Sequence, residues 1–187
     1  LKAARDRQEA GEITHAEFKE IEDRAVDEAV ALQTDAGLDV ITDGEMRRYA
    51  FFGHLVDAVE GFDKWGGKAL TYRNEEGETH SFGRPVVVSR LKRRRHMCAE
   101  EFAYLRAGTG EGGVCVKATL INAQQAASYY EPDKSQAAYP SLDAYMADVV
   151  DILRGEVEEL VRLGCRIIQV DAPQYAGLLD PEVREMY

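Results

Sequence analysis

Residues 37–48 of the 187-residue chain, GLDVITDGEMRR, decide the fold. Ahead of them, residues 14–36 carry apolar side chains at every third or fourth position, which predicts an amphipathic helix. Gly37 is expected to end this helix, because glycine tolerates the left-handed conformation that helix ends require. Residues 38–42 are rich in β-forming side chains, so they predict a short strand, and an acidic turn at residues 43–45 follows it.

The same order of features occurs again near the end of the chain. Ser141 is a candidate cap for a helix whose apolar stripe reaches Leu163. Gly164 is expected to end that helix, residues 166–170 predict a buried strand, and Asp171 follows. A helix that leads into an apolar strand, repeated along the chain, is typical of a parallel α/β sheet.

A third apolar run, residues 114–121, lies between these two copies. We therefore expect Val40-Ile41, residues 114–116 and residues 168–170 to form adjacent parallel strands with helices outside. Their apolar composition predicts that both faces of each strand are buried.

The middle of the chain has a different composition. Residues 71–73 and 85–88 flank a turn signal and predict a small β-hairpin. We interpret residues 61–89 as an insertion within a single domain of residues 1–187. Residues 90–106 predict a helix, whose run of basic side chains is expected to face water rather than a polyanion.

Charge and cysteine content exclude several classes of protein. The net charge is -11, from 34 acidic and 23 basic residues, whereas a nucleic-acid binder needs a basic surface. A run of about 18 apolar residues, the minimum for a membrane span, is absent from the sequence. Three widely spaced cysteines do not form a disulfide framework, so we expect a reducing, cytoplasmic compartment.

Acidic residues follow two of the predicted strands. Asp43 and Glu45 come after the first, and Asp171, preceded by Gln169, ends the last. Ligands of parallel α/β folds bind at the carboxyl ends of strands, where carboxylates can hold a substrate ammonium or orient a metal ligand. The alternative is that these acids only cap helices or form surface turns.

The sequence His96-Met97-Cys98 contains two metal-ligating side chains one residue apart. Zinc needs about four ligands, and no further histidine or cysteine is close in sequence. On the predicted helix the two side chains would point to different faces. We therefore expect no metal site at His96 and Cys98.

Several of these segments resemble the cobalamin-independent methionine synthase family. The resemblance is carried by residues 37–48, by residues 168–173 (IQVDAP), and by aromatic and glycine residues at 51–53 and 61–62. It implies a TIM barrel, of which this chain would hold about strands two to four of eight, with the small hairpin as an insertion.

The resemblance also implies an activity. Members of the family transfer a methyl group from a folate donor, methyltetrahydrofolate, to a thiol such as homocysteine. A zinc ion binds that thiol as the thiolate, which is the better nucleophile. By this match Glu45 and Asp171 bind the substrate ammonium, and Asp43 and Gln169 are further candidates.

The family's zinc ligands, a His-x-Cys pair, a glutamate and a late cysteine, lie on later strands. We therefore expect zinc in the full-length protein, with its ligands downstream of Tyr187, and no activity from this chain alone. The expected partners are a small-molecule thiol and a methyl donor. A partial barrel leaves sheet edges open, so either further strands or a second copy in a homo-oligomer is expected to cover them.

Two rival functions remain open. A relative that transfers alkyl groups to coenzyme M would use a thiol without an amino group, and it would not need Glu45 and Asp171. A non-catalytic barrel that binds an amino acid or a thiol would lack the zinc ligands altogether.

Overall fold

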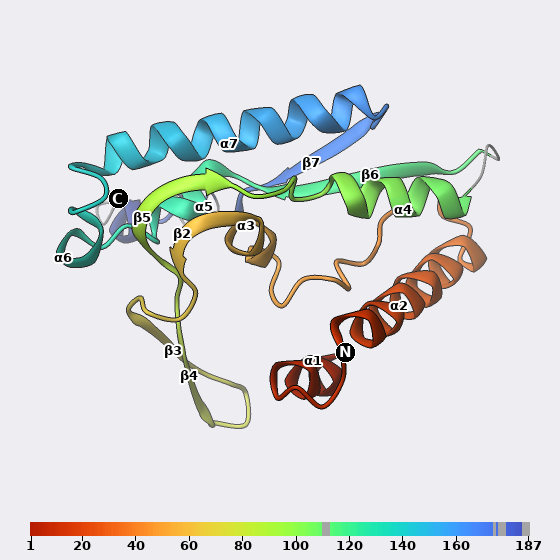
Figure 1. The fold of residues 1–187 in the computed structure, drawn as a ribbon, viewed down its shortest axis with the longest axis horizontal. Helices are drawn as coiled ribbons and strands as arrows, with labels where there is room; N and C mark the ends of the chain where they lie inside the picture. Colours follow the sequence, from red (N-terminus) through yellow and green to blue (C-terminus); the bar gives the residue numbers. More distant parts are fainter. Residues whose placement is uncertain (110–112, 174, 176–178, 185–187) are drawn as a thin grey trace. The chain divides into compact units, whose positions relative to one another are not determined.

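The computed structural model describes residues 1–109, 113–173, 175 and 179–184 (Figure 1). The chain divides into two compact units, which are described separately. The first comprises Leu1–His54, Cys98–Leu120 and Glu159–Gln169, and the second comprises Leu55–Met97, Ile121–Glu158 and Val170–Tyr187. Each unit is therefore made of three separate stretches of the chain. The single partial-barrel domain over residues 1–187 stays a prediction.

The first unit begins with two helices, α1 (Lys2–Glu9) and α2 (His15–Asp35). The predicted capping box is present at the start of α2. Thr14 Oγ1 accepts a hydrogen bond from the Glu17 amide at 3.2 Å, and the Thr14 amide donates to the Glu17 carboxylate at 2.7 Å. Gly37 follows the helix with a φ of 75°, so the predicted end of the helix is also confirmed.

The three predicted strands form one sheet in the order β1-β6-β7, so the α/β class is confirmed. They are β1 (Val40–Ile41), β6 (Cys115–Ile121) and β7 (Ile167–Asp171). Strands β1 and β6 are parallel, with Val40 opposite Cys115, and α2 contacts β1.

Burial of all three strands on both faces was expected, and this is wrong for the two outer strands. Val40 in β1 is 37% exposed and Val170 in β7 is 54% exposed. The central strand β6 is buried over most of its length, because it alone has a hydrogen-bonded neighbour on each side. Position in the sheet therefore decides burial here more than apolar composition does.

The second copy of the helix–glycine–strand pattern is also present. Helix α7 (Leu142–Arg162) follows Ser141, whose Oγ accepts from the Ala144 amide at 3.2 Å. Gly164 ends the helix region with a φ of 86° and leads into β7. None of the helices in the described ranges combines the length and the apolar character needed to cross a bilayer.

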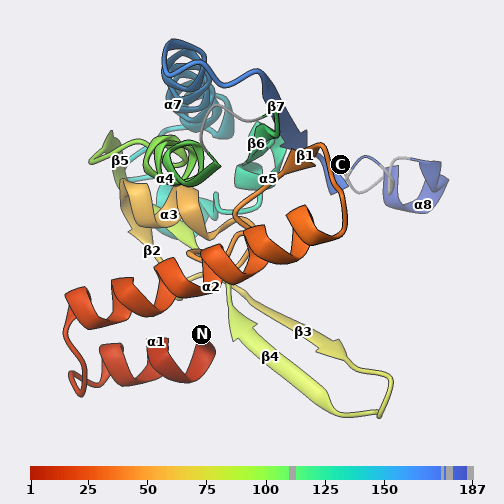
Figure 2. The same ribbon diagram turned by 90° about the vertical axis from the view of Figure 1, so that its right-hand side faces the viewer.

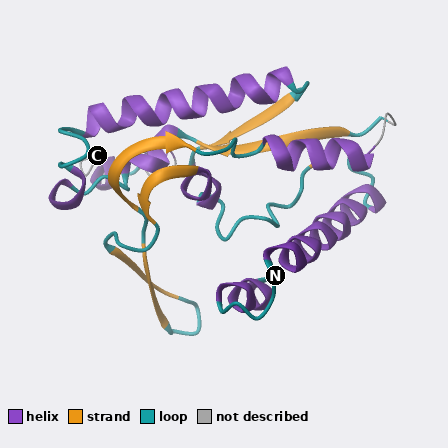
Figure 3. Cartoon of the chain, viewed as in Figure 1, coloured by secondary structure: helices purple, strands orange, loops and turns teal. Residues whose placement is uncertain are grey.

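The second unit contains two antiparallel pairs (Figure 3). Strand β2 (Val59–Asp63) pairs with β5 (Val86–Arg93), and β3 (Ala69–Arg73) pairs with β4 (Thr79–Gly83) in the hairpin that Figure 2 shows.

The predicted hairpin partner was wrong. Residues 71–73 pair with residues 79–81, and not with residues 85–88. A tight turn is the reason: the Asn74 amide donates to the Glu78 carbonyl at 3.0 Å, and the chain therefore returns at once. The antiparallel strands extend from Val59 to Arg93, beyond the predicted limits of 61–89, and their status as an insertion stays a prediction.

The helix expected over residues 90–106 was also partly wrong. Arg90–Arg93 belong to β5, and the helix α4 begins only at Ala99 and ends at Thr109. Lys92 and Arg93 lie opposite Glu60 and Val59, so strand pairing overrides the helical propensity of the basic run.

The remaining helices are short: α3 (Gly53–Ala58), α5 (Ala123–Ala127), α6 (Pro132–Ser135) and α8 (Pro181–Arg184).

Candidate substrate-binding site

The turn that follows β1 has an unusual backbone. Gly44 and Glu45 both have positive φ angles, 66° and 56°, and Glu45 is the only non-glycine residue in the described ranges with such an angle. Two hydrogen bonds hold the turn: the Gly44 amide donates to Thr42 Oγ1 at 3.1 Å, and the Glu45 amide donates to Asp43 Oδ1 at 3.0 Å. A strained glutamate that is held in place in this way is a candidate functional residue.

Helix α2 fixes the position of this turn through one side chain. The Gln33 amide group donates to the Thr42 carbonyl at 2.8 Å, and its oxygen accepts from the Thr42 amide at 2.9 Å. Gln33 thus satisfies both backbone groups of Thr42, where β1 has already ended. The turn is therefore tied to the helix as well as to the sheet.

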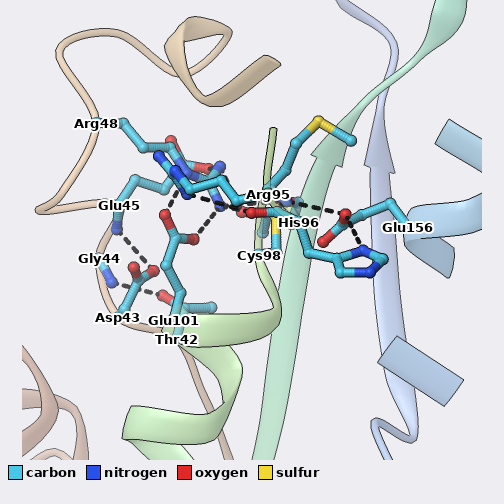
Figure 4. Close-up of polar contacts among 12 residues, drawn as sticks. Thr42, Asp43, Gly44, Glu45, Arg48, Arg95, His96, Cys98, Glu101 and Glu156 are labelled. Carbon is cyan, nitrogen blue, oxygen red and sulfur yellow. Dashed lines mark hydrogen bonds and ion pairs between the residues drawn. The ribbon is translucent and has the colours of Figure 1, made fainter. Parts of the chain in front are cut away.

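The Glu45 carboxylate is held through one of its two oxygens. Its Oε1 accepts from Thr119 Oγ1 at 2.7 Å. The same oxygen accepts from Arg48 Nη1 at 2.9 Å, and Figure 4 shows Glu45 beside Arg48. In the part of the chain that the structure describes, no group donates to Oε2, and the side chain is 29% exposed. One oxygen is therefore fixed, and the other can accept a hydrogen bond from a ligand.

Arg48 lies at the centre of this cluster and is only 3% exposed. Its Nη2 donates to Glu101 Oε2 at 2.7 Å and to the Thr119 carbonyl at 3.1 Å. Burial alone would lower the pKa of Arg48, but the Glu101 carboxylate raises it above the ordinary value, so the guanidinium stays charged. Burial also raises the pKa of the Glu101 carboxyl, and the charge of Arg48 opposes that shift.

Asp43 points into the protein beside this cluster. Its side chain is buried, with 5% exposure, and among the described residues no group donates to Oδ2. A cavity of about 10 Å³ lies next to Asp43, Arg48 and Lys117, which is at the lower limit for a single water molecule. This cavity is too small for an amino acid.

The other two predicted site residues lie on β7. Gln169 accepts from Lys117 Nζ at 2.7 Å, which makes a polar pair between β7 and β6. Asp171 ends β7, and its backbone carbonyl accepts from the Asn122 amide at 3.0 Å. That Glu45 and Asp171 face one cleft stays a prediction.

Comparison with known proteins now decides the family. The model of the family described as "Cobalamin-independent synthase, Catalytic domain" matches residues 1–186. The chain belongs to this family. The relatives include methionine synthases from Pyrococcus abyssi, 29% identical over 88% of this chain, and from Sulfurisphaera tokodaii, 27% identical over 88%. The uncharacterized protein YxjH of Bacillus subtilis is 23% identical over the whole chain.

The chain spans about half the length of these curated relatives: 48% of YxjH and 45% of each of the two archaeal synthases. Two solved structures share the fold. A B12-independent methionine synthase from Shewanella sp. W3-18-1, in complex with selenomethionine, superposes with a TM-score of 0.69 at 22% identity, covering 92% of this chain and 47% of that one. A putative synthase from Listeria monocytogenes also gives 0.69 at 22% identity, covering 100% and 54%.

The two metal-ligating side chains noted in the sequence of this family member are engaged elsewhere. His96 Nδ1 lies 3.0 Å from the Glu156 carboxylate, which is fully buried and also accepts from the Met97 amide at 2.9 Å (Figure 4). The buried Cys98 thiol donates to the Thr119 carbonyl at 3.4 Å. Within the described ranges, no group of three or more His, Cys, Asp or Glu side chains is placed to hold a metal ion.

Three members of the Glu45 cluster were not found by sequence reasoning. Arg48 was part of the quoted motif but received no role, although its spacing of three from Glu45 suits an ion pair in a turn. Thr119 was visible as a hydroxyl within an apolar strand. No feature of the sequence marked Glu101 as a member of the cluster, because 53 residues separate it from Arg48 and only the fold brings the two together.

Proposed function

We propose that this chain forms part of a methyltransferase that transfers a methyl group from a folate donor to the thiol of homocysteine. The family assignment supports the reaction class, and relatives named methionine synthase support the acceptor. A relative from Corynebacterium efficiens is named 5-methyltetrahydropteroyltriglutamate–homocysteine methyltransferase. Membership of the family, which the family model shows, does not depend on this proposal.

The observation that carries the proposal is the half-occupied carboxylate of Glu45. Its Oε1 is fixed by Thr119 and Arg48, while its Oε2 has no donor among the described residues. An ammonium group is the ligand that such a carboxylate prefers, because a charge-assisted hydrogen bond is strong and directional. Homocysteine carries both that ammonium and the reacting thiol.

In this proposal the residues of the chain bind and orient the substrate. Glu45 accepts from the ammonium, and Asp171 at the end of β7 accepts from it as a second carboxylate. Fixing the amino group at one end of a short amino acid limits where its thiol can lie, which favours reaction by orientation. Zinc, when bound in the full-length protein, would lower the pKa of the substrate thiol so that it binds as the thiolate. We propose that the zinc ligands lie downstream of Tyr187.

Methionine formation by the full-length protein tests the proposed function. We compare wild type, Glu45→Gln and Asp171→Asn, with Glu28→Gln, on the exposed face of α2, as the matched control. Loss of a hydrogen bond to a charged group is expected to raise the KM for homocysteine about 10- to 100-fold in the first two variants. The control should behave as wild type.

Two results would overturn the proposal. One is a full-length protein that methylates 4-mercaptobutyrate, which lacks the amino group, as efficiently as homocysteine. The other is an unchanged KM in Glu45→Gln while the protein is folded and active, because the carboxylate would then not contact the substrate.

A further inference from the structure

We propose that Arg48 is a positioning residue that fixes the Glu45 carboxylate in the orientation that binds the substrate ammonium, and that Glu101 is the counter-ion that keeps Arg48 from neutralising Glu45 completely. The inference rests on the proposed function and deepens it. It concerns four side chains of the first unit from three segments: Glu45 and Arg48 in the turn after β1, Glu101 on helix α4 and Thr119 on strand β6.

Arg48 cannot itself bind the substrate without losing its protein partners. Its Nη1 is shared between Glu45 and the Thr119 hydroxyl, at 2.9 and 3.1 Å. Its Nη2 is shared between Glu101 and the Thr119 carbonyl, and its Nε points to Glu101 at 3.5 Å. All three nitrogens have partners and the side chain is 3% exposed, so its role is to fix other groups.

The position of Arg48 determines which Glu45 oxygen remains available. Arg48 and Thr119 both donate to Oε1, so the carboxylate cannot rotate without breaking two hydrogen bonds. The positive φ of Glu45 costs conformational energy that these contacts offset. The pair thus keeps Oε2 directed away from the protein partners and available to a ligand.

Glu101 prevents Arg48 from neutralising Glu45 completely. Its carboxylate is 12% exposed and lies closer to the guanidinium than Glu45 does, 2.7 Å against 2.9 Å. Two carboxylates share one guanidinium, so this triad carries one excess negative charge, which a substrate ammonium would balance. Asp43 and Lys117 line the same small cavity, and Glu101 also feels two opposite charges, those of Asp43 and Arg47.

Steady-state kinetics of the full-length protein test this inference. We expect Arg48→Met to raise the KM for homocysteine about tenfold or more while leaving kcat within about twofold, because binding to Glu45 is lost equally from ground and transition states. The KM for the amine-free thiol 4-mercaptobutyrate should not change. Arg48→Lys, which keeps the charge but cannot bridge both carboxylates, should restore only part of the affinity.

A second readout distinguishes positioning from a merely structural role. Without Arg48 the Glu45 carboxylate loses the partner that fixes Oε1, so the ratio of kcat/KM for homocysteine to kcat/KM for 4-mercaptobutyrate should fall about tenfold, whereas a general loss of structure would lower both values together. Lys19→Met is the matched control, because it also removes a cation from an ion pair of the first unit, 3.2 Å to Asp23, but lies on α2. Its KM for homocysteine and its ratio of the two kcat/KM values should equal those of wild type.

The outcomes are separable. If Glu45→Gln weakens homocysteine binding but Arg48→Met does not, the positioning role is wrong and the proposed function stands. If neither variant changes KM, both are wrong. If Arg48→Met does not fold, Glu101→Gln provides the same test: Arg48 should then turn fully to Glu45, raising the KM for homocysteine several-fold, and an unchanged KM would contradict the inference.

Discussion

The backbone strain at Glu45 leads to a prediction about stability that is independent of any substrate. Glu45→Ala and Glu45→Gly both remove the same carboxylate, with its bonds to Thr119 and Arg48. They differ in one respect: Gly suits the φ of 56°, whereas Ala keeps a β-carbon in the left-handed region. The difference between the two variants therefore isolates the strain.

Its magnitude follows from two opposing terms. The left-handed region costs an L-residue roughly 1–2 kcal/mol. Against this, glycine gives the unfolded chain extra freedom worth about 0.4–1 kcal/mol. We therefore expect Glu45→Gly to be about 0.5–1 kcal/mol more stable than Glu45→Ala.

Urea unfolding followed by circular dichroism measures this difference, provided that both variants unfold in one transition with the same m-value. Gly at position 45 should have the higher midpoint. If the Ala variant is equally stable or more stable, then Glu45 is not strained, and its conformation provides no argument for function.

Two further predictions concern stability. Thr14→Ala should lower the free energy of unfolding by about 1 kcal/mol, because it removes the cap of α2. The control Thr34→Ala, at an exposed position of the same helix, should change the free energy of unfolding by less than about 0.5 kcal/mol. Equal effects of the two variants would contradict the capping role. Burial raises the pKa of Glu22, and Arg5 only partly opposes this shift. An acid whose folded pKa is raised contributes stability at low pH and loses it as the pH rises, so Glu22→Gln should raise the Tm at pH 7 and have no effect below about pH 4. A destabilised Gln variant at pH 7 would show instead that the ion pair with Arg5 dominates.

Local signals in the sequence predicted the helices and strands that lie next to the site. The capping box at Thr14 determines where α2 begins, Gly37 determines where it ends, and Gly164 determines where α7 gives way to β7. Each is a requirement of backbone geometry within a few residues. The apolar run of β6 was predicted for the same reason. Asp171 ends β7 as predicted, whereas β1 ends at Ile41 and Glu45 lies in the turn that follows it.

The rest depended on contacts between distant segments. Residues 90–93 have helix-forming side chains, yet they form part of β5 because β2 provides a hydrogen-bonded neighbour. The partner of Arg48 could not be predicted, because Glu101 is one of many acidic residues and only the packing of α4 brings it to the turn. Gln33, which fixes Thr42 from α2, was missed for the same reason.

A crystal structure of the full-length protein with homocysteine would test the central claim most directly, because it shows which atoms surround the ammonium group. We expect the substrate nitrogen to lie about 2.7–3.0 Å from Glu45 Oε2, with Arg48 still bound to Oε1 and Glu101. A substrate whose ammonium lies away from Glu45, or an Arg48 that has turned to bind the substrate carboxylate, would contradict the account.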